Sequence, residues 1–404
     1  MRQLVLLGIF AFLALCTPSA KAQCNGRYED SLFSEIEKST VSYSPIFNDG
    51  QHQLDLYTPK NDSEEKRPLI VYIHGGSFIS GDKSGIDCQH FAEYFAKRGY
   101  AVASINYRLA NPFLFLASKQ VQYQAVLEAM VDAKTSVRFF LNSTREGNPY
   151  HLDSQAFFLG GYSAGAVTAL HATWIDRLDE LSSEIQSIVS SSIGDLDGDA
   201  GYQDLPFPIQ GLFSFSGALH QTSYLDNSDT EPCYSIHSKD DSTVWYECGP
   251  AYGNPNLLQL CGSGALKERS ESLDLNMHQL ITLENAGHGW AGLGNANPVF
   301  RWALDSINQY LYPLLPCAQS PLALKPQATE PVTLFPNPCA AGQTLFVGNG
   351  TKSVKIATVQ GVSLGHYRVQ NGQITLPELS SGVYTIWAET NKQTIIQTLM
   401  VSKP

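Results

Sequence analysis

The stretch GYSAG at residues 161–165 decides the fold of this chain, because it sets a serine between two glycines where a strand is predicted to become a helix. The apolar run 156–160 before it is typical of a buried strand, and residues 166–172 are typical of a helix. A sharp turn strains the serine backbone, and only glycine-sized neighbours let the two elements pack closely. We therefore expect a hydroxyl held above a sheet, beside the N-terminus of a helix that favours negative charge.

Around this stretch, apolar runs of strand length alternate with patterns of helical spacing. Strands are predicted at 68–73, 101–106, 209–215, 234–237 and 279–283, and helices at 88–98, 120–141 and 298–312. Continuous apolar strands that alternate with helices indicate an α/β fold, a mostly parallel sheet with helices on both faces. Two N-terminal pieces, 41–43 and 54–57, are expected to add antiparallel edge strands.

The chain changes character after Cys317. Residues 318–333 are rich in Pro, Ala, Gln and Thr, have no hydrophobic period and are predicted to be a linker. Residues 334–404 have no helical pattern, and their short predicted strands lie at 345–347, 354–357, 373–376, 383–387 and 395–399. Strands at this spacing predict a small β-sandwich after a catalytic domain of residues 23–317.

Residues 1–22 have the organisation of a secretory signal peptide. Positive charge at Arg2 precedes an apolar core at 4–15, and Ala20-Lys21-Ala22 is a suitable cleavage site. Because an apolar run of about a dozen residues is too short to span a bilayer, a membrane anchor is the weaker alternative. We expect the mature chain to be secreted or to lie at the outer-membrane cell surface.

An exported chain favours disulfides, and the cysteine spacings match no zinc pattern. Seven cysteines follow the signal peptide: Cys24, Cys88, Cys233, Cys248, Cys261, Cys317 and Cys339. Cys248 and Cys261 are close enough in sequence to clip one loop. The pairs Cys24–Cys88 and Cys233–Cys317 are guesses, since six cysteines allow many pairings, and Cys339 is left outside these pairs.

Charge is unevenly distributed along the chain. The formal net charge is −12, although residues 325–404 carry six Lys or Arg against three acidic residues. The preceding body is therefore strongly acidic, which argues against nucleic acid or an anionic membrane surface as a partner.

Acyl transfer by a serine requires hydrogen-bond donors for an oxyanion, and two turns at the predicted carboxyl ends of strands offer them. One is the loop His74-Gly75-Gly76-Ser77-Phe78, after the strand 68–73, with bare backbone N–H groups at Gly75, Gly76 and Ser77. The other is the turn after Ser163, which would contribute the N–H of Ala164. A plain turn is the alternative interpretation of this loop.

The predicted general base is His288, which lies between two glycines after the strand 279–283, with His237 as a distant second candidate. Its acid partner should follow the strand that ends at His237. Asp241 is preferred there over Asp240, which would cap the turn. The order Ser163, Asp241, His288 is that of the α/β-hydrolase triad and requires no cofactor.

The acidic stretch Asp195–Asp199 looks like the start of a calcium loop. Its sixth position is Ala200 instead of Gly, and its twelfth is Pro206 instead of Glu. A solvated turn is therefore the preferred interpretation, and no metal is assigned.

With these motifs, residues 35–315 resemble the carboxylesterase branch of the α/β-hydrolase superfamily. The matching motifs are LDLYTP at 54–59, HGG at 74–76, NYR at 106–108, GYSAG at 161–165, His237-x-x-x-Asp241-x-x-Val244 and GHG at 287–289. Ser77 replaces the third glycine of the HGGG form, and Ser238 stands where glycine is usual. The resemblance implies serine hydrolase chemistry on carboxylic esters.

Residues 334–404 resemble a C-terminal sorting domain of the type IX secretion system of Bacteroidetes. The resemblance rests on LFPNP at 334–338, Gly361, LSSGVY at 379–384 and the closing LMVSK at 399–403. It implies the type IX machinery as a partner and catalysis that does not depend on this domain. A carbohydrate-binding or adhesive β-module is the alternative interpretation.

The sequence thus predicts a secreted serine carboxylesterase that acts on small or sugar-linked acyl esters. The polar segment 175–208 indicates a modest lid, and Phe78, Tyr162 and Trp290 are predicted to line the substrate pocket. A serine exopeptidase on the same fold and a non-catalytic binding protein on a hydrolase scaffold are the alternatives.

Overall fold

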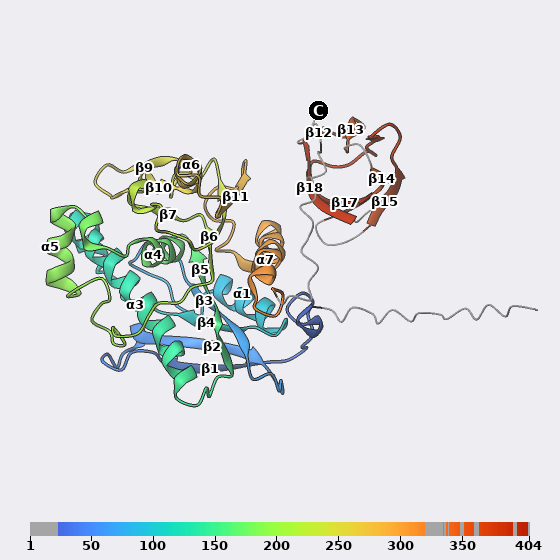
Figure 1. Ribbon diagram of the computed structural model, residues 1–404. Coiled ribbons are helices and arrows are strands. Elements are labelled where there is room, and N and C mark those ends of the chain that lie inside the picture. Colours follow the sequence, from blue (N-terminus) through green and yellow to red (C-terminus); the bar gives the residue numbers. More distant parts are fainter. Residues whose placement is uncertain are drawn as a thin grey trace, which may run out of the picture. The chain divides into compact units, whose positions relative to one another are not determined.

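The computed structural model divides the chain into two compact units, Met1–Pro321 and Leu322–Pro404 (Figure 1). It describes residues 23–319, 334, 337, 339–347, 351–358, 363–390 and 394–402. The predicted signal peptide 1–22 lies outside the described residues, as does all of the predicted linker after Gln319. The junction between the units falls within the residues predicted to be the linker.

An eight-stranded sheet forms the centre of the larger unit. Its strands, in spatial order, are β1 (Ile36–Ser42), β2 (Gln53–Pro59), β4 (Ala101–Ile105), β3 (Arg67–Ile73), β5 (Leu152–Tyr162), β6 (Gly211–Phe215), β8 (Cys233–Ser238) and β11 (His278–Leu283). β1 and β2 are antiparallel additions at one edge, and every pairing from β4 to β11 is parallel. The predicted α/β fold with antiparallel edge strands is confirmed.

Helices cover both faces of this sheet because its strands are apolar on both sides. In β3, Leu69 and Val71 belong to one buried cluster, whereas Ile70 and Tyr72 belong to another. The first cluster packs under α3 (Lys119–Arg145), α4 (Ala164–Trp174) and α5 (Ser183–Ser192), and the second under α1 (Ile86–Ala96) and α7 (Pro298–Leu311). Figure 1 shows these two sets on opposite sides of the sheet. The short helix α2 (Pro112–Ala117) precedes α3.

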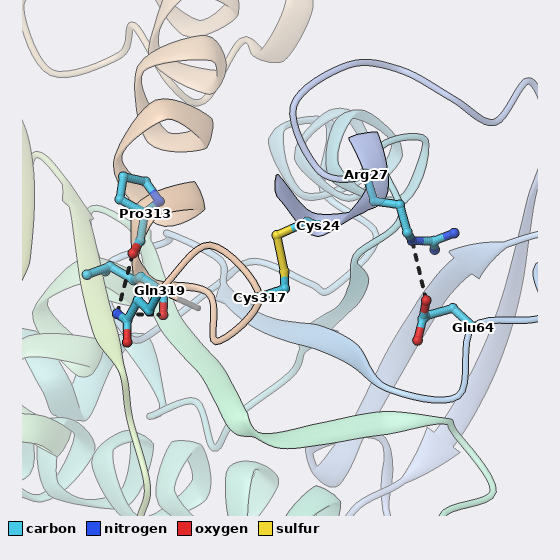
Figure 2. Close-up of a disulfide and its surroundings, with 7 residues drawn as sticks. Cys24, Arg27, Glu64, Pro313, Cys317 and Gln319 are labelled. Carbon is cyan, nitrogen blue, oxygen red and sulfur yellow. Dashed lines mark hydrogen bonds and ion pairs between the residues drawn. A yellow bond between two sulfur atoms is a disulfide. The ribbon is translucent and has the colours of Figure 1, made fainter. Parts of the chain in front are cut away.

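A disulfide joins Cys24, in the N-terminal turn η1 (Gln23–Gly26), to Cys317 beyond α7 (Figure 2). It links positions 293 residues apart in sequence. The guessed pairs Cys24–Cys88 and Cys233–Cys317 are therefore wrong. The Cys88 thiol is buried and directed at the carbonyl of Asp82. Cys233 is buried on one face of the sheet, whereas the residues next to Cys317 pack on the other face.

The second disulfide, Cys248–Cys261, is the one that the spacing predicts. It crosses a hairpin of β9 (Cys248–Pro250) and β10 (Gln259–Gly262), whose register pairs the two cysteines directly. With β7 (Ala218–Leu219) these strands form a small three-stranded sheet, and α6 (Ser263–Ser272) follows. The sequence did not predict this sheet.

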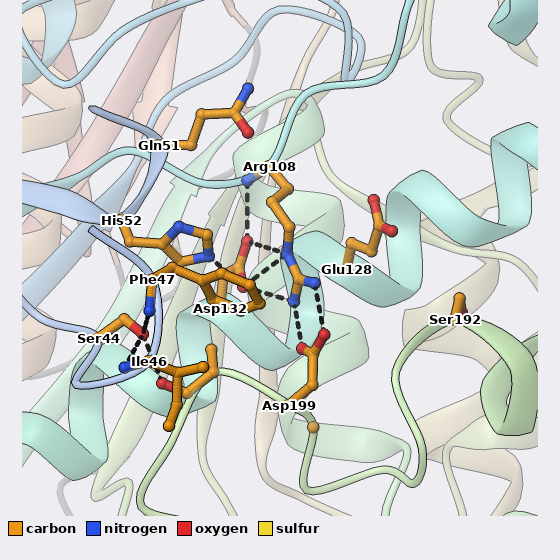
Figure 3. A network of polar contacts seen from close by, with 12 residues as sticks. Ser44, Ile46, Phe47, Gln51, His52, Arg108, Glu128, Asp132, Ser192 and Asp199 are labelled. Atoms are coloured by element: carbon orange, nitrogen blue, oxygen red, sulfur yellow. Dashed lines mark hydrogen bonds and ion pairs between the residues drawn. The ribbon is translucent and has the colours of Figure 1, made fainter. Parts of the chain in front are cut away.

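A polar network fixes the segment before β6 to the body of the domain (Figure 3). The guanidinium of Arg108 donates to Asp132 on α3 at 2.7 Å and to Asp199 at 2.8 Å, and Asp132 has no exposed side-chain surface. Asp197 is similarly paired with Arg138. Two carboxylates of the suspected calcium loop thus bind arginines, and the third, that of Asp195, accepts from the N–H groups of Asp197 and Gly198. No group of three or more potential metal ligands occurs in the described part of the chain.

The smaller unit is built from strands over one core. A five-stranded sheet contains β12 (Cys339–Ala340), β18 (Thr394–Ser402), β17 (Gly382–Thr390), β14 (Thr351–Thr358) and β15 (Ser363–Arg368), and a second sheet pairs β13 (Thr344–Phe346) with β16 (Gln373–Thr375). Leu345 and Ile374 of the second sheet share a buried cluster with Ile356 and Ile386 of the first, as in a β-sandwich. No helix among the described residues is long and apolar enough to cross a membrane.

Candidate active site

Ser163 lies at a strained turn between β5 and α4. Its φ and ψ angles are 55° and −122°, a conformation that residues with side chains rarely adopt. The Ser163 N–H donates to the carbonyl of Phe215 at 2.9 Å, which holds the turn against the end of β6. A Cβ atom added to Gly161 would lie 2.3 Å from the carbonyl oxygen of Ile73, and one added to Gly165 would lie 2.0 Å from the same oxygen. Both glycines are therefore required by the close approach of β3.

His288 and Asp241 continue from this serine in an unbroken hydrogen-bonded chain. The Oγ atom of Ser163 lies 2.8 Å from Nε2 of His288, and Nδ1 of His288 lies 2.7 Å from Oδ2 of Asp241. Because an ionised carboxylate only accepts, Nδ1 carries the proton and Nε2 is free to accept the serine proton. The structure thus brings together the three residues that the sequence selected from three distant loops.

Asp241 is fully buried and surrounded by donors. Burial by itself raises the pKa of Asp241, but hydrogen bonds from His237, His288 and the Val244 N–H outweigh it and hold the pKa well below its usual range. Nδ1 of His237 accepts from the Ser263 N–H, so His237 Nε2–H donates to Val244 O at 2.9 Å and lies 3.4 Å from Asp241. His237 therefore supports the acid and does not reach the serine.

Asp240, the less favoured candidate for the triad acid, lies away from the imidazole of His288. Its exposed carboxylate accepts from the Gly287 N–H at 2.9 Å and from the hydroxyl of Ser238. It thus binds the loop of His288 from outside without contacting the imidazole.

The His74–Phe78 loop lies against the serine. A Cβ atom on Gly75 would be 3.2 Å from that of Ser163, and Gly76, Ser77 and Phe78 all have positive φ angles. Ala164 is the first residue of α4, where an N–H has no acceptor within the helix. The loop and the helix start thus lie beside Ser163, where the sequence predicts the backbone donors of an oxyanion site.

A small apolar cavity opens at Ser163, with a volume of about 60 Å³. Helices contribute Phe115, Gln122, Val126, Ala164 and Val167 to its wall, and the segment around the β9–β10 hairpin contributes Thr243, Val244, Ala251, Tyr252, Leu257, Leu258 and Leu260. Ser77 and Phe78 complete the lining. Phe78 thus occupies its predicted place, whereas the hairpin residues were missed, because a wall built from a loop has no periodic sequence signal.

Trp290 and Tyr162 do not border this cavity. The indole of Trp290 is 1% exposed, donates to Ser216 at 3.1 Å and packs on Phe215, so the prediction that it lines the pocket is wrong. The hydroxyl of Tyr162 donates to the carbonyl of His288 at 3.0 Å. Both aromatic residues instead support the loop that carries the imidazole.

Comparison with known proteins agrees with this architecture. A family model described as BD-FAE, an α/β-hydrolase family of esterases, matches residues 54–195, which include the loop of His74 and the turn of Ser163. Among solved structures, a truncated carbohydrate esterase from gut microbiota is similar with a TM-score of 0.50 and 17% identity, over 70% of this chain and 98% of that one. The larger unit therefore has the fold of carboxylesterase-like α/β-hydrolases.

Two curated relatives match over shorter stretches. A non-reducing polyketide synthase, atr1, of Stereocaulon alpinum is 27% identical over 158 residues, which are 39% of this chain and 6% of that protein. Probable carboxylesterase 6 of Arabidopsis thaliana is 35% identical over 119 residues, which are 27% of this chain and 31% of that protein. The chain thus spans less than a third of the length of either relative.

Proposed function

We propose that the protein is a secreted serine carboxylesterase that hydrolyses small or sugar-linked acyl esters. The observation that carries the proposal is the hydrogen-bonded chain from Ser163 through His288 to Asp241, which ends at a small apolar cavity. A nucleophile, its base and an orienting acid within hydrogen-bond reach, beside backbone donors, make up the machinery of acyl transfer.

In the proposed reaction, Ser163 Oγ attacks the ester carbonyl carbon while His288 Nε2 takes the serine proton. The N–H groups of Ala164 and of the loop 75–77 stabilise the negative charge on the former carbonyl oxygen. When the C–O bond to the alcohol breaks, His288 returns that proton to the leaving oxygen, and an acyl-serine ester remains. Water, deprotonated by His288, then attacks the acyl carbon, releases the carboxylic acid and restores Ser163.

The size of the cavity favours a short acyl group. About 10–15 Å³ accommodates one water-sized sphere, so about 60 Å³ accommodates only a few. An acetyl or similar group fits this space, whereas a long fatty chain would extend beyond it. The alcohol part would lie outside the cavity, where a sugar can be accepted.

Export and sorting belong to the same proposal. Residues 1–22 would direct the chain out of the cytoplasm, and residues 334–404 would address it to the type IX secretion machinery and then be cleaved or anchored at the surface. The support for this part is the sequence motifs together with the strands that make up the described part of the smaller unit.

Hydrolysis of p-nitrophenyl acetate and butyrate by wild type and Ser163→Ala tests the catalytic proposal. Turnover should fall by at least about 10³-fold in the variant. Ser190→Ala, which changes an exposed serine of α5, should behave as wild type. A folded wild-type protein without esterase activity would contradict the proposal, and fluorophosphonate labelling of Ser163 would then separate a peptidase, which reacts, from a non-catalytic scaffold, which does not.

A further inference from the structure

One wall of the acyl cavity comes from the segment that joins β9 to β10. The Cys248–Cys261 disulfide ties the base of this hairpin, and residues 251–258 extend from it to the cavity. Leu257 and Leu258 of this segment are buried, whereas Tyr252 is 55% exposed. A residue that lines the cavity and is also half in solvent lies at its rim, which is therefore the position of Tyr252.

Tyr252 is held in this position from both ends. Its N–H donates to the carbonyl of Thr243 at 2.9 Å, and its hydroxyl lies 2.6 Å from Oγ of Ser77, which belongs to the proposed oxyanion loop. Tyr252 and Ser77 have φ angles of 56° and 57°, a region that residues with side chains seldom occupy. Two strained residues from segments 175 positions apart therefore meet over the cavity. Strain of this kind persists where the surrounding structure fixes it and is common at ligand clamps.

We propose that the Tyr252–Ser77 bridge closes the acyl cavity and sets the longest acyl chain that the enzyme accepts. The inference rests on the proposed esterase function and identifies the residues that make it selective. An acyl chain longer than the cavity must displace the Tyr252 ring and break its hydrogen bond to Ser77. The enzyme would consequently lose activity steeply as the acyl chain is extended, and this loss would depend on two side chains outside the triad.

The test compares kcat/KM of the full chain for p-nitrophenyl acetate, butyrate and octanoate. Tyr252→Ala should raise the octanoate-to-acetate ratio by at least about 10-fold, since apolar space for even one methylene is worth 10-fold or more in specificity. Tyr252→Phe and Ser77→Ala break the bridge but keep the ring, so each should give a smaller rise. The double variant Tyr252→Phe/Ser77→Ala should have the same octanoate-to-acetate ratio as either single variant, because both substitutions remove the same contact.

Phe113→Ala is the matched control, since Phe113 is an aromatic residue of α2 that is 83% exposed and does not line the cavity. It should leave the ratio unchanged. An unchanged ratio in Tyr252→Ala, in an enzyme that hydrolyses acetate, would overturn the inference and leave the esterase function intact. If Tyr252→Ala does not fold, unchanged ratios in both bridge variants overturn it equally. Absence of acetate hydrolysis in the folded wild type contradicts the esterase function itself.

Discussion

Asp240 and Asp241 are neighbours in sequence, yet their carboxylates have different environments and different partners. Asp241 is buried and bonded to the imidazole of His288, whereas Asp240 is exposed and bonded to the backbone of Gly287. The preference for Asp241 came from its spacing in the motif that begins at His237. The buried hydrogen bond at 2.7 Å supplies the physical reason for it.

We expect Asp241→Asn and Asp240→Asn to separate these roles. Asp241→Asn replaces an acceptor-only carboxylate with a neutral amide that can also donate, so the proton is no longer fixed on Nδ1 of His288 and the imidazolium loses its counter-charge. We therefore expect kcat to fall by about 10³- to 10⁴-fold. Asp240→Asn keeps an oxygen that can accept from the Gly287 N–H, and kcat should change by less than about 10-fold. Steady-state hydrolysis of p-nitrophenyl acetate measures both, and a larger loss in Asp240→Asn would contradict the assignment.

The same carboxylate should make stability depend on pH. The pKa of Asp241 is lower in the folded chain than the value of about 3.9 in an unfolded chain. A depressed pKa contributes stability that is fully present above about pH 4 and is lost as the pH falls through the folded value. The free energy of unfolding of wild type relative to Asp241→Asn should therefore decrease as the pH falls below about 4. Urea denaturation at several pH values measures this difference, and one that grows on acidification would contradict the direction of the shift.

At the level of elements, the strand–turn–helix around Ser163 could be predicted because its glycines, apolar strand and helix are contiguous. The central strands were predictable for the same reason, since each is a continuous apolar run. The wall of the cavity was not predictable, because Tyr252 and Leu257 lie in a connecting segment without periodicity. Trp290 was misplaced because an aromatic residue beside His288 can equally well pack behind the imidazole loop as line a pocket.

The turn itself can be tested by Gly165→Ala. The new Cβ atom would lie 2.0 Å from the carbonyl oxygen of Ile73 and 2.7 Å from that of His74, both backbone atoms that cannot turn aside. Overpacking at such a site should destabilise the fold by about 3 kcal/mol and displace Ser163. Gly50→Ala is the control, because nothing lies within 4 Å of its added Cβ and its change in stability should stay within about 0.5 kcal/mol. Equal thermal denaturation midpoints for the two variants would show that β3 does not constrain the turn.

For the whole molecule, the compositional change after Cys317 was a sufficient signal for a second unit. The signal was weaker inside that unit, where the strands β12 and β15 have no clear apolar pattern and were not predicted. The pairing of Cys24 with Cys317 was not predictable either. This pairing requires the first and last segments of the larger unit to lie side by side, and no local sequence pattern predicts that.

The division into two units predicts that catalysis is confined to the first. The buried clusters of the larger unit contain described residues up to Ala318, and the buried cluster of the smaller unit contains described residues from Cys339 onward, so each unit has a core of its own. A chain that ends at Pro321 keeps both disulfides and all residues of the candidate site. Its kcat/KM for p-nitrophenyl acetate should stay within about two-fold of the full chain, because domains with their own core fold alone.

The same truncation tests the sorting role proposed for the smaller unit. In a host with a type IX system, the full chain should reach the cell surface or medium, whereas the chain ending at Pro321 should remain active but periplasmic. A fusion of residues 322–404 to an unrelated exported protein should restore export, which a merely stabilising module would not do. Loss of activity in the purified truncated chain would instead place residues 322–404 in the catalytic unit, and unchanged export would remove the sorting role from them.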